Sequence, residues 1–432
     1  MHHFQYKDRT LFCEDVPVPA IARAVGTPFY LYSHATLTRH FLAFEKAFER
    51  IPHIVCFSAK ANTSQAILHL FAGLGGGLDI VSGGELYRGL RAGIPPDKIV
   101  YSGVGKTREE IDYALETGIL MFNVESGDEL LAINERAGAL GRRAPIAIRI
   151  NPDVDPKTHP YISTGLKKNK FGIDTQRAME GYRSALDLKH VDVVGIDFHI
   201  GSQITQVEPF VEATHSIAVL IRELRHLGIE IQYVDVGGGL GINYGDELPP
   251  DPEDYAGAIA GVLSALSARL ILEPGRVIVG NAGVLVAKVL YLKHGGAKSF
   301  VVVDAGMNDL VRPAMYDAFH AIWPVHKRDG EEVEADVVGP ICESSDFLAK
   351  NRRLAGVMPG DLLSVMSAGA YGFCMASNYN SRPRVSEVMV HGDTFEVIRE
   401  RESYEDLVRG ERIPSFLNRY ARRRHLKGAK EV

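Results

Sequence analysis

The sequence contains little cysteine, and its cysteines are widely spaced. Four cysteines in 432 residues are too few for a disulfide framework, and no Cys-x-x-Cys pair suggests a zinc site. We therefore expect a reducing, cytoplasmic location and no metal ion. The four cysteines are Cys13, Cys56, Cys342 and Cys374.

An excess of positive charge and long apolar runs are also lacking. The 48 Lys and Arg residues are outnumbered by 54 Asp and Glu residues, and the formal charge of -6 argues against nucleic acid and anionic membranes as partners. The one basic segment, 419–430, is interpreted as a solvated chain end. The most apolar stretch, 277–292, contains Asn281 and Lys288, so no membrane span is expected, and the first residues show no signal-peptide pattern.

Short apolar runs rich in β-branched residues alternate with segments of helical periodicity over the first two thirds of the chain. Strands that are apolar on both faces and are each followed by a helix lie parallel, with the helices outside. Eight such strands predict a closed (β/α)₈ barrel of the TIM type, and an open doubly wound sheet is the alternative. The runs are 54–57, 78–81, 99–101, 120–124, 146–150, 194–199, 233–236 and 270–272.

The pattern changes after residue 282, where strands follow one another without long helices between them. Two segments near the N-terminus, 4–12 and 28–32, are also strand-like. We predict an N-terminal segment, 1–34, that joins a β-rich C-terminal domain, 282–432, with the barrel at 35–281 between them. The predicted C-terminal strands are 284–292, 299–304, 333–338, 361–366, 385–390 and 394–398.

Barrel enzymes carry their chemistry on the loops that follow the strands, so the residues just past each run are the candidates. Lys60 follows the first run directly. A partly desolvated ammonium there has a lowered pKa, which suits Schiff-base formation with a carbonyl cofactor. Considered alone, Lys60 is more simply explained as a lysine that extends from the barrel rim into water.

Three consecutive glycines, Gly237, Gly238 and Gly239, follow the seventh run. Glycines let backbone N–H groups converge on an anion, which predicts a phosphate-binding loop. A tight turn without a ligand is the alternative. The segment matches neither the dinucleotide fingerprint nor a P-loop, because Ile242 stands at the last glycine position and the P-loop lysine is missing.

Glu273 and Arg276 follow the last run, and His199 ends the sixth run. The carboxylate can hold a proton on a heterocyclic nitrogen, and the arginine can bind an anion through paired N–H donors. The alternatives are an ion pair between Glu273 and Arg276 on the rim and a structural core role for His199. A lysine, a phosphate loop, a carboxylate and a flat imidazole at one end of a barrel together indicate pyridoxal 5'-phosphate.

These motifs resemble the pyridoxal-phosphate decarboxylases of the alanine-racemase-like fold, and within them the diaminopimelate decarboxylase family. The resemblance extends over 27–383, and segment 57–62 is similar to the family's cofactor-lysine motif, with Ser58 where relatives usually carry alanine. It implies that Lys60 binds the cofactor covalently, that His199 stacks on its ring and that Glu273 contacts its nitrogen. The implied cofactor-binding residues are Lys60, His199, Gly237, Gly238, Gly239, Glu273, Gly275, Arg276 and Tyr371.

Three C-terminal motifs, 307–316, 339–346 and 368–372, are similar to the substrate-contacting segments of the same family. In relatives the second reaches into the neighbouring subunit's site, which implies a homodimer with shared active sites and Cys342 as the acid. The implied reaction converts meso-2,6-diaminopimelate to L-lysine and CO₂, the last step of lysine biosynthesis. The implied substrate contacts are Arg276, Arg312, Tyr316, Glu343 and Tyr371.

The chemistry of that substrate agrees with these residues, because its remote end carries both a carboxylate and an ammonium. Arg276 and Arg312 can bind the carboxylate, and Glu343 can bind the ammonium. Considered singly, Arg312 and Glu343 are ordinary surface charges and Cys342 is a buried apolar residue. The alternatives are an ornithine, arginine or carboxynorspermidine decarboxylase, an alanine-type racemase, and a non-catalytic pyridoxal-phosphate-binding or regulatory homologue.

Overall fold

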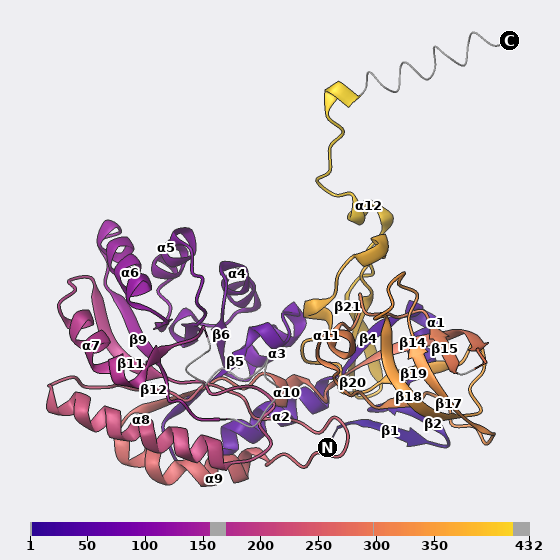
Figure 1. Cartoon of the computed structure of the whole chain (residues 1–432), viewed down its shortest axis with the longest axis horizontal. Helices are drawn as coiled ribbons and strands as arrows, with labels where there is room; N and C mark the ends of the chain where they lie inside the picture. The colour runs from indigo at the N-terminus through magenta and orange to yellow at the C-terminus, as the bar shows by residue number, and fades with distance from the viewer. Residues whose placement is uncertain (1, 156–169, 297, 418–432) are drawn as a thin grey trace.

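The chain forms a closed barrel and a β-rich body that lie side by side (Figure 1). The computed structural model describes residues 2–155, 170–296 and 298–417. The basic segment 419–430 lies outside the described residues. Within the described ranges, every helix falls short of the length and apolar character that a bilayer span requires.

The barrel consists of eight parallel strands that pair in chain order. The first and last strands, β5 and β13, pair with each other, so the sheet closes and the predicted barrel is confirmed over the open sheet. A two-residue strand, β10 (Ile173–Asp174), adds to β9 outside the ring. The barrel strands are β5 (His53–Ser58), β6 (Gly77–Ile80), β7 (Ile99–Tyr101), β8 (Met121–Val124), β9 (Ala144–Asn151), β11 (Val191–Asp197), β12 (Tyr233–Asp235) and β13 (Arg269–Leu272).

Helices cover the outside of the barrel, and several of them begin at a side chain that accepts from a first-turn N–H group. Ser82 and Ser126 accept from the backbone of the first turn, and Thr107 forms a complete capping box with Glu110. These helices are α2 (His34–Ala47), α3 (Gln65–Gly73), α4 (Gly83–Ala92), α5 (Arg108–Thr117), α6 (Gly127–Ala139), α7 (Thr175–Leu186), α8 (Glu208–His226), α9 (Pro252–Leu263) and α10 (Arg276–Val279). Short 3₁₀ turns are η1 (Ala59–Ala61), η2 (Pro96–Lys98) and η3 (Ser264–Leu266).

The second body is a mostly antiparallel sheet that includes a strand from the N-terminal segment. Strand β4 lies between β14 and β20, so the two ends of the chain share one sheet. All six C-terminal strands that the sequence predicts are present. The strands are β4 (Phe29–Ser33), β14 (Gly283–His294), β15 (Ser299–Val303), β16 (Ile322–Pro324), β17 (Glu332–Val338), β18 (Phe347–Ala355), β19 (Leu362–Val365), β20 (Ser386–His391) and β21 (Thr394–Arg399).

Two strands of this sheet were not predicted, and each has a physical reason. Strand β16 has only three residues, and β18 carries a polar run, 350–353, which its position at the end of the sheet allows to face water. Short helical segments connect the strands and continue beyond them. They are α11 (Arg312–Tyr316), η4 (Phe373–Met375), η5 (Tyr379–Ser381), α12 (Tyr404–Leu407) and η6 (Ser415–Leu417).

The first residues form a separate small sheet rather than the single strand expected over 4–12. The turn at Asp8 and Arg9, where φ is 45° and 66°, divides the segment into two antiparallel strands. The hairpin is attached to the β-rich body, because Leu11 N–H donates to the Val325 carbonyl at 2.7 Å. The elements are β1 (Phe4–Lys7), β2 (Thr10–Cys13), β3 (Val16–Pro17) and α1 (Val18–Val25). The domain limits 1–34, 35–281 and 282–432 stay a prediction.

One loop, 368–372, fastens the β-rich body to the mouth of the barrel. Its backbone bonds to the residues after α10, with Gly369 N–H donating to the Gly280 carbonyl at 3.0 Å. At its other end Tyr371 N–H donates to the Ala61 carbonyl at 2.8 Å. A Cβ atom at Gly369 would lie 1.9 Å from the Val279 carbonyl oxygen, so only glycine permits this approach. The loop therefore sets Tyr371 beside the turn that carries Lys60.

We predict that Gly369→Ala lowers the free energy of unfolding by about 1–3 kcal/mol, because the new methyl group must displace backbone atoms. Urea unfolding followed by circular dichroism measures the change. The matched control is Gly257→Ala on the exposed side of α9, where no atom lies within 4 Å of the new carbon. The free energy of unfolding of that variant should rise by about 0.5–1 kcal/mol, because alanine favours a helix interior over glycine. Equal stability of the two variants would contradict the packing argument.

Candidate active site

A cavity of about 630 Å³ lies where the barrel mouth faces the β-rich body. It brings together residues that the sequence analysis selected from distant parts of the chain. From the barrel come Lys60, His199 and Arg276, and from the other body Arg312, Tyr316 and Tyr371. The glycines 237–239 and Glu273 lie directly behind this lining, at the ends of β12 and β13. The predicted convergence of these residues at one end of the barrel is thus present.

Lys60 lies in η1, immediately after β5, and its side chain exposes 33% of its surface. Its Nζ donates to Asp79 Oδ2 at 2.6 Å, and Asp79 itself is fully buried on β6. Enclosure by the protein lowers the pKa of Lys60, but the carboxylates of Asp79 and Glu273 outweigh this effect and raise the pKa above its ordinary value. The lowered pKa expected from the sequence is therefore wrong for the chain by itself.

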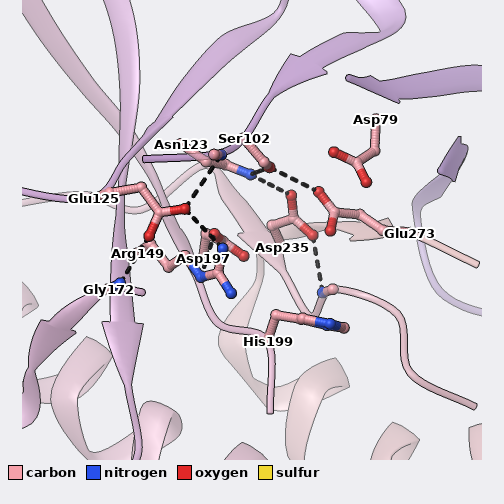
Figure 2. A network of polar contacts seen from close by, with 12 residues as sticks. Asp79, Ser102, Asn123, Glu125, Arg149, Gly172, Asp197, His199, Asp235 and Glu273 are labelled. Atoms are coloured by element: carbon pink, nitrogen blue, oxygen red, sulfur yellow. Dashed lines mark hydrogen bonds and ion pairs between the residues drawn. The ribbon is translucent and has the colours of Figure 1, made fainter. Parts of the chain in front are cut away.

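Asp79 lies beside a group of buried polar side chains inside the barrel (Figure 2). Asn123 Nδ2 donates to Asp235 Oδ2 at 3.0 Å and to Ser102 Oγ at 3.0 Å, and Ser102 Oγ donates to Glu273 Oε1 at 3.3 Å. Among the described residues, no group of three His, Cys, Asp or Glu side chains is placed to hold a metal ion. Apart from Glu273, the sequence analysis missed these residues. A signal existed, because nearly every barrel strand ends with one polar residue after its apolar run.

The carboxyl groups in this network outnumber the cations beside them, and the pKa values of several of these groups are raised. Burial is the main cause that raises the pKa of Glu273 and of Asp197 well above the ordinary range, and neighbouring carboxylates add to it. Burial likewise raises the pKa of Asp235 to about 6. Besides Lys60, the cation in the network is Arg149 on β9. The site therefore holds protons on some of these acids and can accept a further positive charge.

Arg149 forms a buried ion pair with Glu125 at 2.8 Å. Glu125 also accepts from the backbone N–H of Gly103 at 3.2 Å and of Gly172 at 2.7 Å, so one carboxylate joins two loops at the barrel mouth. The guanidinium lies over the ring of Phe171, 4.9 Å from its centre. This pair fixes the wall of the cavity opposite the β-rich body.

His199 follows β11 and contacts the glycine loop. Gly238 N–H donates to His199 Nδ1 at 3.2 Å, which leaves the proton of the neutral ring on Nε2. Burial, then the charges of Arg149 and Lys60, lower the pKa of His199 well below its ordinary value. The imidazole is therefore neutral and presents a flat face to the cavity, as the predicted stacking role requires.

The glycine loop has no room for side chains. A Cβ at Gly238 would lie 2.0 Å from the Glu273 carbonyl oxygen, and one at Gly239 would lie 2.4 Å from that of Gly201. Gly237 and Gly239 also have φ of 64° and 111°, in the region that favours glycine. The loop therefore presents backbone without side chains beside His199, which is the kind of surface that a phosphate group needs.

The residues of the barrel mouth fit pyridoxal 5'-phosphate. An amine stands at the opening, a backbone cradle lies beside it, and a buried carboxyl group with a raised pKa gains from a cationic ring nitrogen. Each of these groups comes from the end of a different barrel strand. Together the fold and the site define a barrel enzyme of the pyridoxal-phosphate class.

On the opposite wall, two buried arginines converge on one hydroxyl group. Arg276 Nη1 and Arg312 Nη1 each donate to Tyr244 Oη at 2.7 Å, and Arg276 Nη2 donates to Ser202 Oγ at 2.9 Å. The alternative of a Glu273–Arg276 rim pair is thereby excluded. Within the described part of the chain neither arginine has an acidic partner, so this wall is a site for an anion.

Cys342 and Glu343 do not enter the cavity of their own chain. Both are exposed on the loop after β17, where Cys342 N–H donates to Asn380 Oδ1 at 2.7 Å and Tyr379 donates to Glu343 Oε2 at 3.4 Å. The interpretation of Cys342 as a buried apolar residue is wrong. Their predicted action in the site of a neighbouring subunit stays a prediction.

Comparison with known proteins agrees with this site. The family model described as pyridoxal-dependent decarboxylase, pyridoxal binding domain, matches residues 34–280. A diaminopimelate decarboxylase of Vibrio cholerae is 53% identical over 409 residues, which cover 94% of this chain and 98% of that protein. The chain is thus a pyridoxal-dependent decarboxylase.

Solved structures give the same result for the whole fold. The crystal structure of diaminopimelate decarboxylase from M. jannaschii has a TM-score of 0.92 at 42% identity, covering 96% of this chain and 99% of that one. That of the Helicobacter pylori enzyme complexed with L-lysine has a TM-score of 0.88 at 46% identity, covering 91% and 98%. The chain belongs to the diaminopimelate decarboxylase family.

The raised pKa of Asp235 predicts how the free energy of unfolding depends on pH. Its pKa is about 6 in the folded chain and ordinary in the unfolded chain, so the folded state keeps the proton longer and loses stability as the pH rises from about 4 to 6. Asp235→Asn removes this cost. We expect the variant to be more stable than the parent at pH 8 by on the order of 1–3 kcal/mol, with the difference shrinking toward pH 4.

Urea unfolding of the cofactor-free protein across this pH range measures the effect. Asn123 Nδ2 donates to Asp235, so the introduced amide gains an acceptor when the Asn123 amide turns over and presents Oδ1, which has no hydrogen-bond partner in the described chain. Asp393→Asn, at the exposed turn between β20 and β21, is the control and should follow the parent at every pH. If the stability gained by Asp235→Asn over the parent grew toward low pH, the prediction would be contradicted.

Proposed function

We propose that this chain converts meso-diaminopimelate to L-lysine and CO₂, with the site residues in the roles described below. The observation that carries the proposal is the pair of buried arginines, Arg276 and Arg312, across the cavity from Lys60. A diamino dicarboxylic acid places one amino-acid head at the lysine and its second carboxylate at the arginines. The L-lysine in the Helicobacter pylori structure supports a product of this kind.

Pyridoxal 5'-phosphate, when bound, supplies a ring that accepts the electron pair left behind as CO₂ departs. Lys60 would hold its aldehyde carbon, and Glu273 would keep a proton on its nitrogen. His199 would cover one face of the ring, and the phosphate would be bound by the backbone of Gly237, Gly238, Gly239, Gly275 and Arg276. Tyr371, which the loop 368–372 sets beside the turn of Lys60, bounds the space between cofactor and substrate.

Binding of the remote carboxylate follows from charge. The guanidinium groups of Arg276 and Arg312 are desolvated and lack acidic partners in the described chain, so a carboxylate that enters meets two cations at low dielectric. Tyr316 lines the same wall and adds a hydroxyl donor. An ornithine-type substrate would bring an ammonium to this wall and would be repelled, which disfavours the ornithine and arginine decarboxylase alternatives.

Completion of the site requires a second copy of the chain. The acid that protonates the α-carbon is Cys342, and the acceptor for the remote ammonium is Glu343, both supplied by the other subunit of a homodimer. Support comes from their exposure outside their own cavity. The four free thiols are compatible with a cytoplasmic location, and the net charge of -6 does not favour a nucleic-acid partner.

Borohydride reduction followed by peptide mapping tests the role of Lys60. We expect the cofactor to be fixed on the peptide that contains Lys60, and Lys60→Ala to abolish both labelling and CO₂ release because no other amine replaces it. CO₂ release is then measured with meso-diaminopimelate, ornithine, arginine and lysine. Only the first should react. Labelling at Lys106, which is engaged by Glu129 at 2.6 Å, or turnover of ornithine alone, would contradict the assignment.

Mixing two inactive variants tests the shared site. Lys60→Ala and Cys342→Ala chains, unfolded together in equal amounts and refolded, should recover about a quarter of parental activity, because half of the dimers then contain one intact site. The double variant treated in the same way is the control and should stay inactive. If the mixture is no more active than its components, Cys342 does not act across subunits.

A further inference from the structure

Behind the two arginines lies a set of polar side chains that the reaction roles above leave unexplained. Tyr244 is held by Glu247, whose Oε2 accepts from its backbone N–H at 3.1 Å, and its hydroxyl receives both guanidinium groups. His320 is completely buried, and its Nε2 lies 3.1 Å from Arg312 Nη1. Neither residue belongs to the sequence motifs discussed above.

His320 is fixed as a neutral acceptor by its second nitrogen. Its Nδ1 lies 2.8 Å from the Met366 carbonyl oxygen, which accepts only, so Nδ1 carries the proton. Nε2 therefore carries a lone pair, and Arg312 donates to it. Burial and then the charge of Arg312 lower the pKa of His320 to about 3, which keeps the ring neutral at physiological pH.

The Tyr244 hydroxyl accepts two N–H donors, so both of its lone pairs are used and its own proton remains to be donated. The ring adds a second contact, with Arg312 Cζ 4.6 Å and Arg276 Cζ 5.8 Å from its centre. Two like charges are thus held side by side by an oxygen and a π-face that carry no formal charge. Ser202, which accepts a hydrogen bond from Arg276, and the ring of Tyr371, 4.9 Å from Arg276 Cζ, are also neutral.

We propose that Tyr244 and His320 are positioning residues that make the remote subsite selective for a carboxylate, because they orient Arg276 and Arg312 through neutral acceptors only. An acidic residue in either place would orient the arginines equally well but would cancel their charge. Neutral acceptors leave both charges for the substrate. This inference rests on the proposed function, in which the remote group of the substrate is a carboxylate.

The sharpest test compares His320→Gln with His320→Glu in the holoenzyme. The two side chains have the same shape and both offer an oxygen to Arg312, but only the second carries charge. We expect the Gln variant to keep the KM for meso-diaminopimelate within a few-fold of the parent. The Glu variant should raise it by about ten- to a hundredfold, with a smaller change in kcat.

Inhibition by 1,5-diaminopentane separates carboxylate selectivity from a general loss of binding. This diamine has no carboxylate, whereas the product lysine keeps the remote one, so the inhibition constant of the diamine should not rise more than a few-fold in the Glu variant while the KM for diaminopimelate rises. A merely structural role for His320 would weaken both ligands together, and this result would overturn the proposal. Equal KM values for the Gln and Glu variants would also overturn it, because the charge of the acceptor would then be irrelevant.

Tyr244→Phe is a second variant that keeps the ring and its packing but removes the shared hydroxyl. It should raise the KM for diaminopimelate by about tenfold or more and leave inhibition by 1,5-diaminopentane nearly unchanged. Tyr291→Phe, on an exposed part of β14, is the matched control and should behave as the parent. An unchanged KM in Tyr244→Phe would overturn the proposal for Tyr244.

Cofactor absorbance and circular dichroism confirm that each variant is folded and loaded before the constants are compared. The proposed function is tested separately by the parental enzyme. If the parent releases no CO₂ from diaminopimelate, the proposed function fails and this inference fails with it. If the parent is active and the variants show the wrong pattern, only the inference fails.

Discussion

The ion pair between Lys60 and Asp79 is the contact on which the rest of the barrel mouth depends. A partly enclosed ammonium and a fully buried carboxylate are each costly alone, and at 2.6 Å each offsets the desolvation of the other. Without Lys60, Asp79 would add another uncompensated charge to a group of acids that already share too few cations. Glu273 and Asp197 show the effect of this excess of acids. Burial raises their pKa values, and the neighbouring carboxylates raise them further. A cationic ring nitrogen therefore enters a site that favours it.

Groups of opposite charge lie on two sides of the cavity. Buried carboxyl groups lie behind the side that carries Lys60 and suit a cationic ring nitrogen. On the other side are Arg276 and Arg312, whose hydrogen-bond partners within the described chain are neutral oxygen and nitrogen atoms. A substrate with a carboxylate at its far end therefore meets two cations there.

Close backbone packing holds these two walls together. The loop 368–372 bonds to the end of α10 on one side and to the turn of Lys60 on the other, and Gly369 permits the approach. Strand β4 joins the N-terminal segment to the sheet that carries Arg312 and Tyr371. The arginine wall is therefore rigidly placed relative to a lysine more than two hundred residues earlier in the chain.

The sequence by itself determined the closed barrel, most of the strands and the positions of Lys60, His199, the glycine loop and Glu273. Local periodicity and strand ends carry that information. Only the tertiary structure decided that Lys60 pairs with Asp79, which reversed the expected direction of its pKa, and that Cys342 is exposed. Local patterns also did not predict the hairpin before residue 14 or strand β18. The same holds for the contacts of the two arginines with Tyr244 and His320. Each depends on contacts between residues far apart in the chain, and no spacing within a short segment reports such contacts.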